Sequence, residues 1–413
     1  MEYSFGHEID TYINQIKSLN YYFQSIMSMI EKDRDKNLRI LDSLIKEKGV
    51  KKIDKTKKVT KIIFNVEMFS KYISLRNKFI TSREAYKIIP RSLFVSLVSQ
   101  FDAYLGNLIR IMFKIKPELL NLSEKNISYS ELIEYSSIDD IKDYIISKEI
   151  DSILRDGHID QFDWLEKRLG IKLRKDLKAW SIFVEATERR NLFVHCDGKV
   201  TKQYLNVCRN HRVERSVEFD IGKTLSVDEK YFTQAYKCLF EIGVKLGHVI
   251  WRKIQEEDRE EADKNLNNIS YYLINDEDYE LSIILLIFAT DILKKYSSEE
   301  SKHVFIVNKA QVYKWNGNNE ECRKIIEGVD WSAADLKFKL AKFVLLDDFK
   351  SALEIMKKIG KDGDIKKVDY KEWPLFKEFR KSEKFLKMFE EIFGEKFEIS
   401  EEEEEKLKEL VKQ

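Results

Sequence analysis

The segment from residue 186 to 198 gathers side chains that can act on a phosphodiester. It contains Arg190, Asn191 and His195. A histidine can take the proton from a ribose 2′-hydroxyl or give one to the leaving 5′-oxygen. An arginine can hold the non-bridging phosphate oxygens and the charge of the transition state. Together with the amide of Asn191, these groups could cleave RNA without a metal ion and leave a 2′,3′-cyclic phosphate and a 5′-hydroxyl.

Helical geometry places only part of this set on one face. We expect a helix from Leu177 to Cys196, with Gly198 placed to end it. Glu188, Asn191 and His195 are then at positions i, i+3 and i+7 and share a face. Arg190 lies about 100° around the helix from Asn191, so its long side chain must bend toward that face. The alternative is that His195 is a core histidine or a helix cap.

The arginine, the polar residue after it and a histidine five positions on resemble the R-x4-H motif of HEPN ribonucleases. Arg190, Asn191 and His195 match the family's arginine, polar residue and catalytic histidine. An earlier segment, residues 99–105, also resembles the first core helix of HEPN domains. The resemblance covers roughly residues 85–250. It implies a homodimer that pairs across the motif helix, a site that collects both copies, and no cofactor.

Three further residues are candidates for supporting this site: Asp102, Glu188 and Arg189. Asp102 interrupts the apolar stripe of a helix expected over residues 93–113. Its carboxylate could orient the arginine of the motif helix. Alternatively, it could cap a helix or satisfy a polar group in the core.

Any RNA site must be a local basic patch, because the chain carries 73 Lys and Arg against 72 Asp and Glu. One candidate patch, in an expected exposed loop around Gly49, contains Lys51, Lys52, Lys57 and Lys58. Another, in a loop after residue 207, contains Arg209 and Arg212. Each is either a solvated segment or a set of contacts to RNA phosphates.

The composition predicts a mainly all-α chain, since only 3 Pro and 14 Gly interrupt 413 residues. Residues 9–47 should form one long helix or a kinked pair, and Pro90 should begin a helix. Residues 204–207 and 216–222 alternate enough to predict a small β-hairpin or an extended excursion. The expected fold is a HEPN-like helical bundle with this β excursion, followed by a helical-repeat domain.

We expect three regions: an N-terminal helical region (1–84), a HEPN-like domain (85–255) and a repeat domain (262–397). A charge run at residues 256–264 marks the second boundary. Beyond it, polar turns at 275–279, 315–320 and 346–349 each precede an amphipathic helix. The pattern is similar to tetratricopeptide repeats, although an unrelated helical bundle would also fit. Such repeats could bind a regulatory protein or a trigger.

Other classes of protein find little support. The four cysteines have no zinc spacing, and no metal site or cofactor is expected. P-loop, HExxH and GxSxG motifs are absent. No apolar run reaches membrane-spanning length and the first residues do not resemble a signal peptide, so a cytoplasmic protein is expected.

The favoured interpretation is a metal-independent endoribonuclease, a toxin or antiviral effector that acts on RNA such as tRNA or mRNA. The alternative is a catalytically inactive adaptor that binds RNA or protein.

Overall fold

The structure is a computed structural model that describes residues 4–54, 59–122, 128, 131, 134–174, 177–213 and 220–397. The chain divides into two compact units, Met1–Ile254 and Gln255–Gln413. Each unit is mainly helical, as the composition predicts. Within the described ranges, no helix has both the length and the apolar character needed to cross a membrane.

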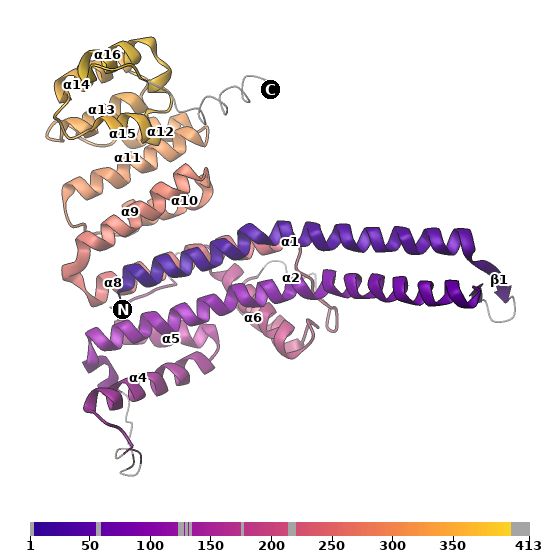
Figure 1. Ribbon diagram of the computed structural model, residues 1–413. Helices are drawn as coiled ribbons and strands as arrows, with labels where there is room; N and C mark the ends of the chain where they lie inside the picture. Colours follow the sequence, from indigo (N-terminus) through magenta and orange to yellow (C-terminus); the bar gives the residue numbers. More distant parts are fainter. Residues whose placement is uncertain are drawn as a thin grey trace. The chain divides into compact units, whose positions relative to one another are not determined.

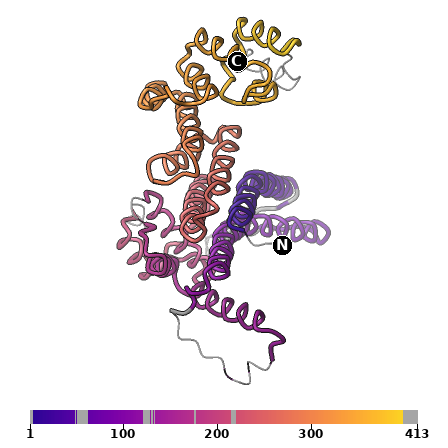
Figure 2. Tube along the Cα trace, turned by 90° about the vertical axis from the view of Figure 1, so that its left-hand side faces the viewer, coloured from indigo at the N-terminus to yellow at the C-terminus, as the bar shows by residue number. Residues whose placement is uncertain are grey.

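Two long helices form the frame of the first unit. Helix α1 (Phe5–Lys48) and helix α2 (Val66–Ile115) run side by side (Figures 1 and 2). The helix expected over residues 9–47 is therefore a single element. The helix expected to begin at Pro90 does not begin there, because α2 passes through this buried proline. For the same reason, the boundary expected after residue 84 falls inside a helix.

A short hairpin connects α1 to α2, where the sequence predicts an exposed loop. Strands β1 (Val50–Asp54) and β2 (Val59–Ile63) pair antiparallel, with Val50 opposite Ile63. Gly49 ends α1, and its N–H donates to the carbonyl of Ile45 at 3.1 Å. The β-branched residues of both segments suit a strand better than a loop, which is the physical reason for the difference.

The remaining elements of the first unit are η1 (Pro117–Leu122), α4 (Ile138–Arg155), α5 (His158–Leu169), α6 (Trp180–His195), α7 (Lys202–Asn210) and α8 (Glu229–Ile254). Stacked aromatic rings join α1 to α2 and to α8. The ring centroids of Tyr12 and Tyr104 lie 4.3 Å apart, and those of Phe23 and Phe232 lie 4.0 Å apart. A Cβ atom added at Gly243 would lie 2.2 Å from the Tyr12 ring, so the absence of a side chain there permits this approach.

The prediction of a β-hairpin after the motif helix is wrong for its first strand. Residues 204–207 lie in α7, because Tyr204, Leu205 and Cys208 fall on one helical face and are buried together. The stretch at 216–219, expected as part of the second strand, lies outside the described residues. After α6, Lys199 and Thr224 form an isolated antiparallel bridge.

The second unit contains helical hairpins. Its elements are η3 (Glu256–Asp258), α9 (Arg259–Asn275), α10 (Tyr279–Ile287), the π-helical η4 (Phe288–Ile292), α11 (Glu299–Trp315), α12 (Asn319–Glu327), α13 (Leu336–Leu345), α14 (Phe349–Ile359), α15 (Lys367–Glu372), η5 (Pro374–Phe376), η6 (Phe379–Lys381) and α16 (Glu383–Phe393). The polar turns lie where the sequence predicts them, between α9 and α10, α11 and α12, and α13 and α14.

These three turns share one backbone geometry. Each has a residue with positive φ: Glu277 at 57°, Gly317 at 83° and Asp347 at 60°. The next residue caps the second helix, so Asp278, Asn318 and Asp348 each accept a hydrogen bond from the backbone N–H three residues later. The three hairpins are therefore locally equivalent, although their spacing in the sequence is unequal.

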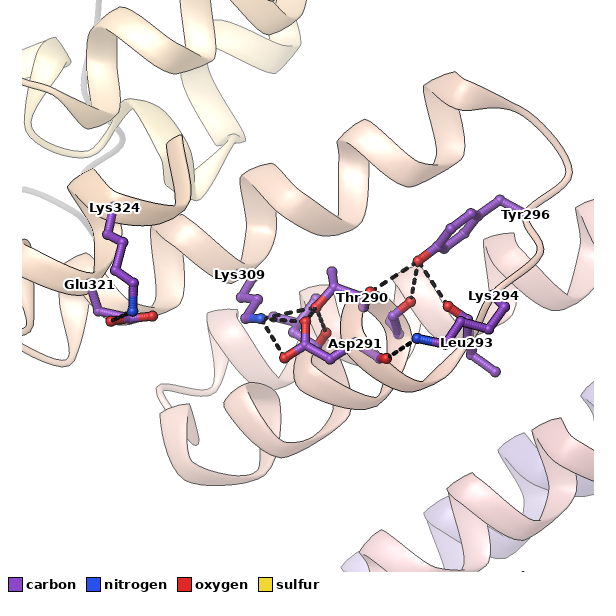
Figure 3. Close-up of polar contacts among 10 residues, drawn as sticks. Thr290, Asp291, Leu293, Lys294, Tyr296, Lys309, Glu321 and Lys324 are labelled. Carbon is purple, nitrogen blue, oxygen red and sulfur yellow. Dashed lines mark hydrogen bonds and ion pairs between the residues drawn. The ribbon is translucent and has the colours of Figure 1, made fainter. Parts of the chain in front are cut away.

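An ion-pair cluster fastens the π-helical end of α10 to α11 (Figure 3). The ammonium of Lys309 donates to both carboxylate oxygens of Asp291, at 2.8 and 3.0 Å, and to Oγ1 of Thr290 at 3.1 Å. Burial raises the pKa of Asp291, but the contacts to Lys309 and Thr290 outweigh it and leave the pKa below its usual value. At the same helix end, the Tyr296 hydroxyl donates a hydrogen bond to the carbonyl of Ala289 at 2.9 Å.

Candidate active site

Helix α6 carries the candidate motif and packs against α2, α5, α7 and α8. Its apolar residues Phe183, Ala186 and Leu192 are buried, which fixes the rotation of the helix in the first unit. The helix ends at His195, and the N–H of Gly198 donates to the carbonyl of Leu192 at 2.9 Å. Gly198 has a φ of 74°, in agreement with its expected place at the helix end.

Arg190 points toward α2 and forms an ion pair with Asp102. Its other terminal nitrogen, Nη1, donates to Oδ1 of Asn191 at 3.1 Å. These two contacts hold the Arg190 guanidinium in place, and the side chain as a whole keeps 21% of its surface exposed. The contact of Asp102 with Arg190 fits the sequence interpretation in which Asp102 orients the arginine. Its contact with the buried His158 fits the alternative, in which it satisfies a polar group in the core.

Asp102 also contacts a residue that is not among the candidates from the sequence. Its Oδ1 lies 2.7 Å from Nε2 of His158, the first residue of α5. Burial raises the pKa of Asp102, but His158 and Arg190 outweigh that effect and leave this pKa below its usual value. No local signal marks His158 in the sequence, since it lies 56 positions away from its partner.

Glu188 stands on the same side of α6 as Asn191 and is half-buried. Burial raises the pKa of Glu188, and the neighbouring His158 and Asn191 oppose this shift without cancelling it. The expected face of Glu188 and Asn191 is therefore a polar cluster, and Asp102 and His158 extend it from two other helices. We call Asp102, His158, Glu188, Arg190 and Asn191 the Asp102 cluster.

His195 is exposed and lies outside this cluster. Among the described residues, its side chain forms no hydrogen bond or ion pair. It follows Arg190 by five positions, which corresponds to about 140° around a helix. The two motif side chains thus point in different directions within one copy of the chain, although each keeps some exposed surface.

Arg189 does not join the Asp102 cluster. It is buried on another side of α6, where its Nε donates to Glu185 at 2.7 Å and its Nη1 donates to the carbonyl of Ser226 at 3.1 Å. Tyr204 and Tyr231 also donate to the Glu185 carboxylate, at 2.7 and 2.6 Å. These buried contacts hold α6, α7 and α8 together, so the geometry gives Arg189 a structural role.

Arg91, which is not among the candidates from the sequence, is a further cation near the His195 end of α6. It extends from α2 and donates to Oδ1 of Asp197 at 3.3 Å and to the carbonyl of Leu225 at 3.3 Å. Its guanidinium also lies over the ring of Phe193, 5.3 Å from the centroid. Arg91 therefore places a partly exposed positive charge beside the segment that follows His195.

The predicted patch of Arg209 and Arg212 lies at the other end of α6 from His195. Arg209 and Arg212 are exposed at the end of α7, and His211 between them accepts a hydrogen bond from Trp180, the first residue of α6, at 3.3 Å. His195 is the last residue of that helix, roughly 22 Å along its axis. Lys51 and Lys52 lie on β1, and Lys57 and Lys58 lie outside the described residues.

Across the described ranges, no three His, Cys, Asp or Glu side chains are grouped as a metal site would require. Searches with protein-family models, among curated proteins and among solved structures found no match for this chain.

Proposed function

We propose that this chain is a metal-independent endoribonuclease of the HEPN type. One observation carries the proposal: near the end of α6, Arg190 forms an ion pair with Asp102, and the nearby His195 is exposed to solvent. In this proposal His195 transfers the proton of the 2′-hydroxyl or of the leaving oxygen. Arg190 binds the phosphate and its developing charge, and Asn191 helps to orient it.

We further propose that the working site is shared by two copies of the chain. Arg190 and His195 point about 140° apart on one helix, so one copy does not bring both to the same phosphate without movement. A second copy, paired across α6, would place its own His195 near Arg190. The RNA backbone would then run past Arg91, whose charge lies at this end of the helix.

The decisive experiment is cleavage of labelled RNA by the purified protein in EDTA. We expect cuts that leave 2′,3′-cyclic phosphate ends, and a loss of at least about 100-fold for His195→Ala and for Arg190→Ala. His303→Ala is the matched control, since His303 lies in the second unit against Trp331 and Phe338. Equal cleavage by wild type and both site variants would refute the proposal.

One observation favours a second candidate, an inactive RNA-binding or protein-binding adaptor. The Arg190 guanidinium is already occupied by Asp102 and Asn191, and it does not contact His195. An adaptor would bind RNA with an affinity that falls with salt and survives His195→Ala, and it would show no turnover. A protein-binding adaptor would show no salt-dependent affinity for RNA.

In both cases we propose that the hairpins of the second unit receive a regulatory protein or trigger. Helices α9, α11 and α13 contribute Tyr271, Asn308 and Lys337 to one shallow pocket, which Trp373 also lines. Such a role would fit a toxin or antiviral effector that is silent until signalled. Comparing RNA cleavage by the wild type and by Trp373→Ala, with and without cell extract, tests whether this pocket transmits a signal.

A further inference from the structure

We propose that His158 is a positioning residue that holds Asp102 so that Asp102 can aim Arg190. This inference rests on the proposed ribonuclease function and adds a residue to it. The juxtaposition that carries it is a chain of contacts from α5 to α2 to α6, made by His158, Asp102 and Arg190 in that order.

Each carboxylate oxygen of Asp102 contacts a different residue. Oδ1 meets His158 at 2.7 Å, and Oδ2 meets Arg190. The terminal torsion of an aspartate is broad, so a carboxylate held at one oxygen can still rotate. A second contact at the other oxygen removes that freedom. His158 therefore fixes the plane of the carboxylate that receives the guanidinium.

His158 is itself firmly placed. Only 8% of its surface is exposed. Its ring packs edge-on against Phe183 at 5.7 Å and tilted against Phe101 at 6.2 Å. Phe183 lies on α6 with Arg190, and Phe101 adjoins Asp102 on α2. The imidazole therefore lies at the junction of the two helices whose side chains it aligns.

Arg190 depends on this support because it has few other partners. Its Nε is buried and has no hydrogen-bond partner among the described residues. The orientation of the guanidinium thus rests on its terminal nitrogens, one at Asp102 and one at Asn191. Loss of the His158 contact would leave the guanidinium attached to a carboxylate that can turn.

Replacing His158 with two amides of different length separates this role from simple packing. In His158→Gln, the side-chain nitrogen can occupy the place of Nε2 and still donate to Asp102. In His158→Asn, it falls short. We expect H158N to lower kcat for RNA cleavage about 10- to 100-fold with little change in KM, because misplacing a catalytic group costs this much. We expect H158Q to recover most of the loss.

A double-mutant cycle tests whether His158 acts through Arg190. H158N should have no further effect on the residual rate of Arg190→Ala, since the group that it positions is gone. His303→Asn is the control for replacing a ring-packed histidine by asparagine, and thermal melts of all variants check folding. If H158N does not fold, H158Q alone is compared with wild type and in the Arg190→Ala background.

The outcomes are distinct. The inference is supported when H158N cleaves RNA more slowly than the wild type, H158Q recovers most of that rate, and H158N has no further effect in the Arg190→Ala background. It is overturned when H158N cleaves like the wild type, or when its loss adds fully to that of Arg190→Ala. In the H158Q-only case, a rate far below wild type would overturn it. If the wild type does not cleave RNA, the proposed function itself fails, and this role fails with it.

Discussion

Arg189 and Arg190 are neighbours in the sequence, yet their guanidinium groups belong to separate clusters on different sides of α6. Arg189 is buried with Glu185, at 2.7 Å, and lies over the ring of Tyr231 at 3.8 Å. Arg190 is partly exposed and pairs with Asp102. A turn of about 100° per residue separates adjacent side chains, so one helix can present one arginine to the core and the next to a partly exposed polar cluster.

This separation predicts different consequences for the same substitution. Arg189→Met leaves the buried Glu185 carboxylate without its cation, and we expect unfolding free energy to fall by about 3–5 kcal/mol. Arg190→Met removes a more exposed pair and should cost clearly less, while under the proposed function it should lower cleavage at least about 100-fold. Denaturant unfolding of the two variants, followed by helical circular dichroism, makes the comparison. Equal destabilisation would contradict the assignment of Arg189 to the core.

The lowered pKa of Asp102 predicts how its contribution to stability depends on pH. A carboxylate with a depressed pKa in the folded state stabilises the protein above its unfolded pKa, about 3.9, and this contribution is lost as pH falls through the folded value. Asp102→Asn should therefore lower the melting temperature at pH 7, and the difference should shrink below about pH 4. A difference that is the same at pH 7 and pH 3 would show that the charge is not involved.

Glu188 should behave in the opposite way, because its pKa is raised. The protonated form is favoured in the folded state, so this contribution is present below the unfolded pKa, about 4.3, and is lost as pH rises through the folded value. Glu188→Gln should raise the melting temperature at pH 7 and change it little at pH 4. The same melts as for Asp102→Asn provide the test, and a lower melting temperature at pH 7 would contradict it.

The shared turn geometry of the second unit predicts that removing a glycine from one turn and adding one to another have opposite effects on stability. Gly317→Ala puts a side chain on a residue with a φ of 83°, and no atom within 4 Å would oppose its Cβ. We expect a cost of about 1 kcal/mol from backbone strain alone. Glu277→Gly, at the equivalent position, should be neutral or stabilising by less than about 1 kcal/mol, because relief of strain exceeds the added chain entropy.

Unfolding of the two glycine variants by urea measures both effects, and Gly328→Ala is a control with an ordinary φ. If Gly317→Ala is harmless, the three turns do not share the strain that their φ angles indicate.

The sequence by itself determined most of the helical segments and where many of them end. Apolar residues at three- and four-residue steps predict α1 and the later half of α2, and local caps such as Ser137, Gly157 and Gly170 mark the ends of α4 and α5. These signals are local, so they can be read without knowing the neighbours. The secondary structure of short segments is harder to predict. Residues 204–207 span too few helical turns for their apolar pattern to distinguish a strand from a helix.

Tertiary structure alone decided how the candidate site is composed. Periodicity could place Arg189 and Arg190 on different sides of a helix, but the packing of Glu185, Tyr204 and Tyr231 decided which one is buried. His158 became a partner of Asp102 only because α5 begins beside α2. Contacts between residues far apart in the chain depend on the whole arrangement of helices, and no pattern within one segment encodes them.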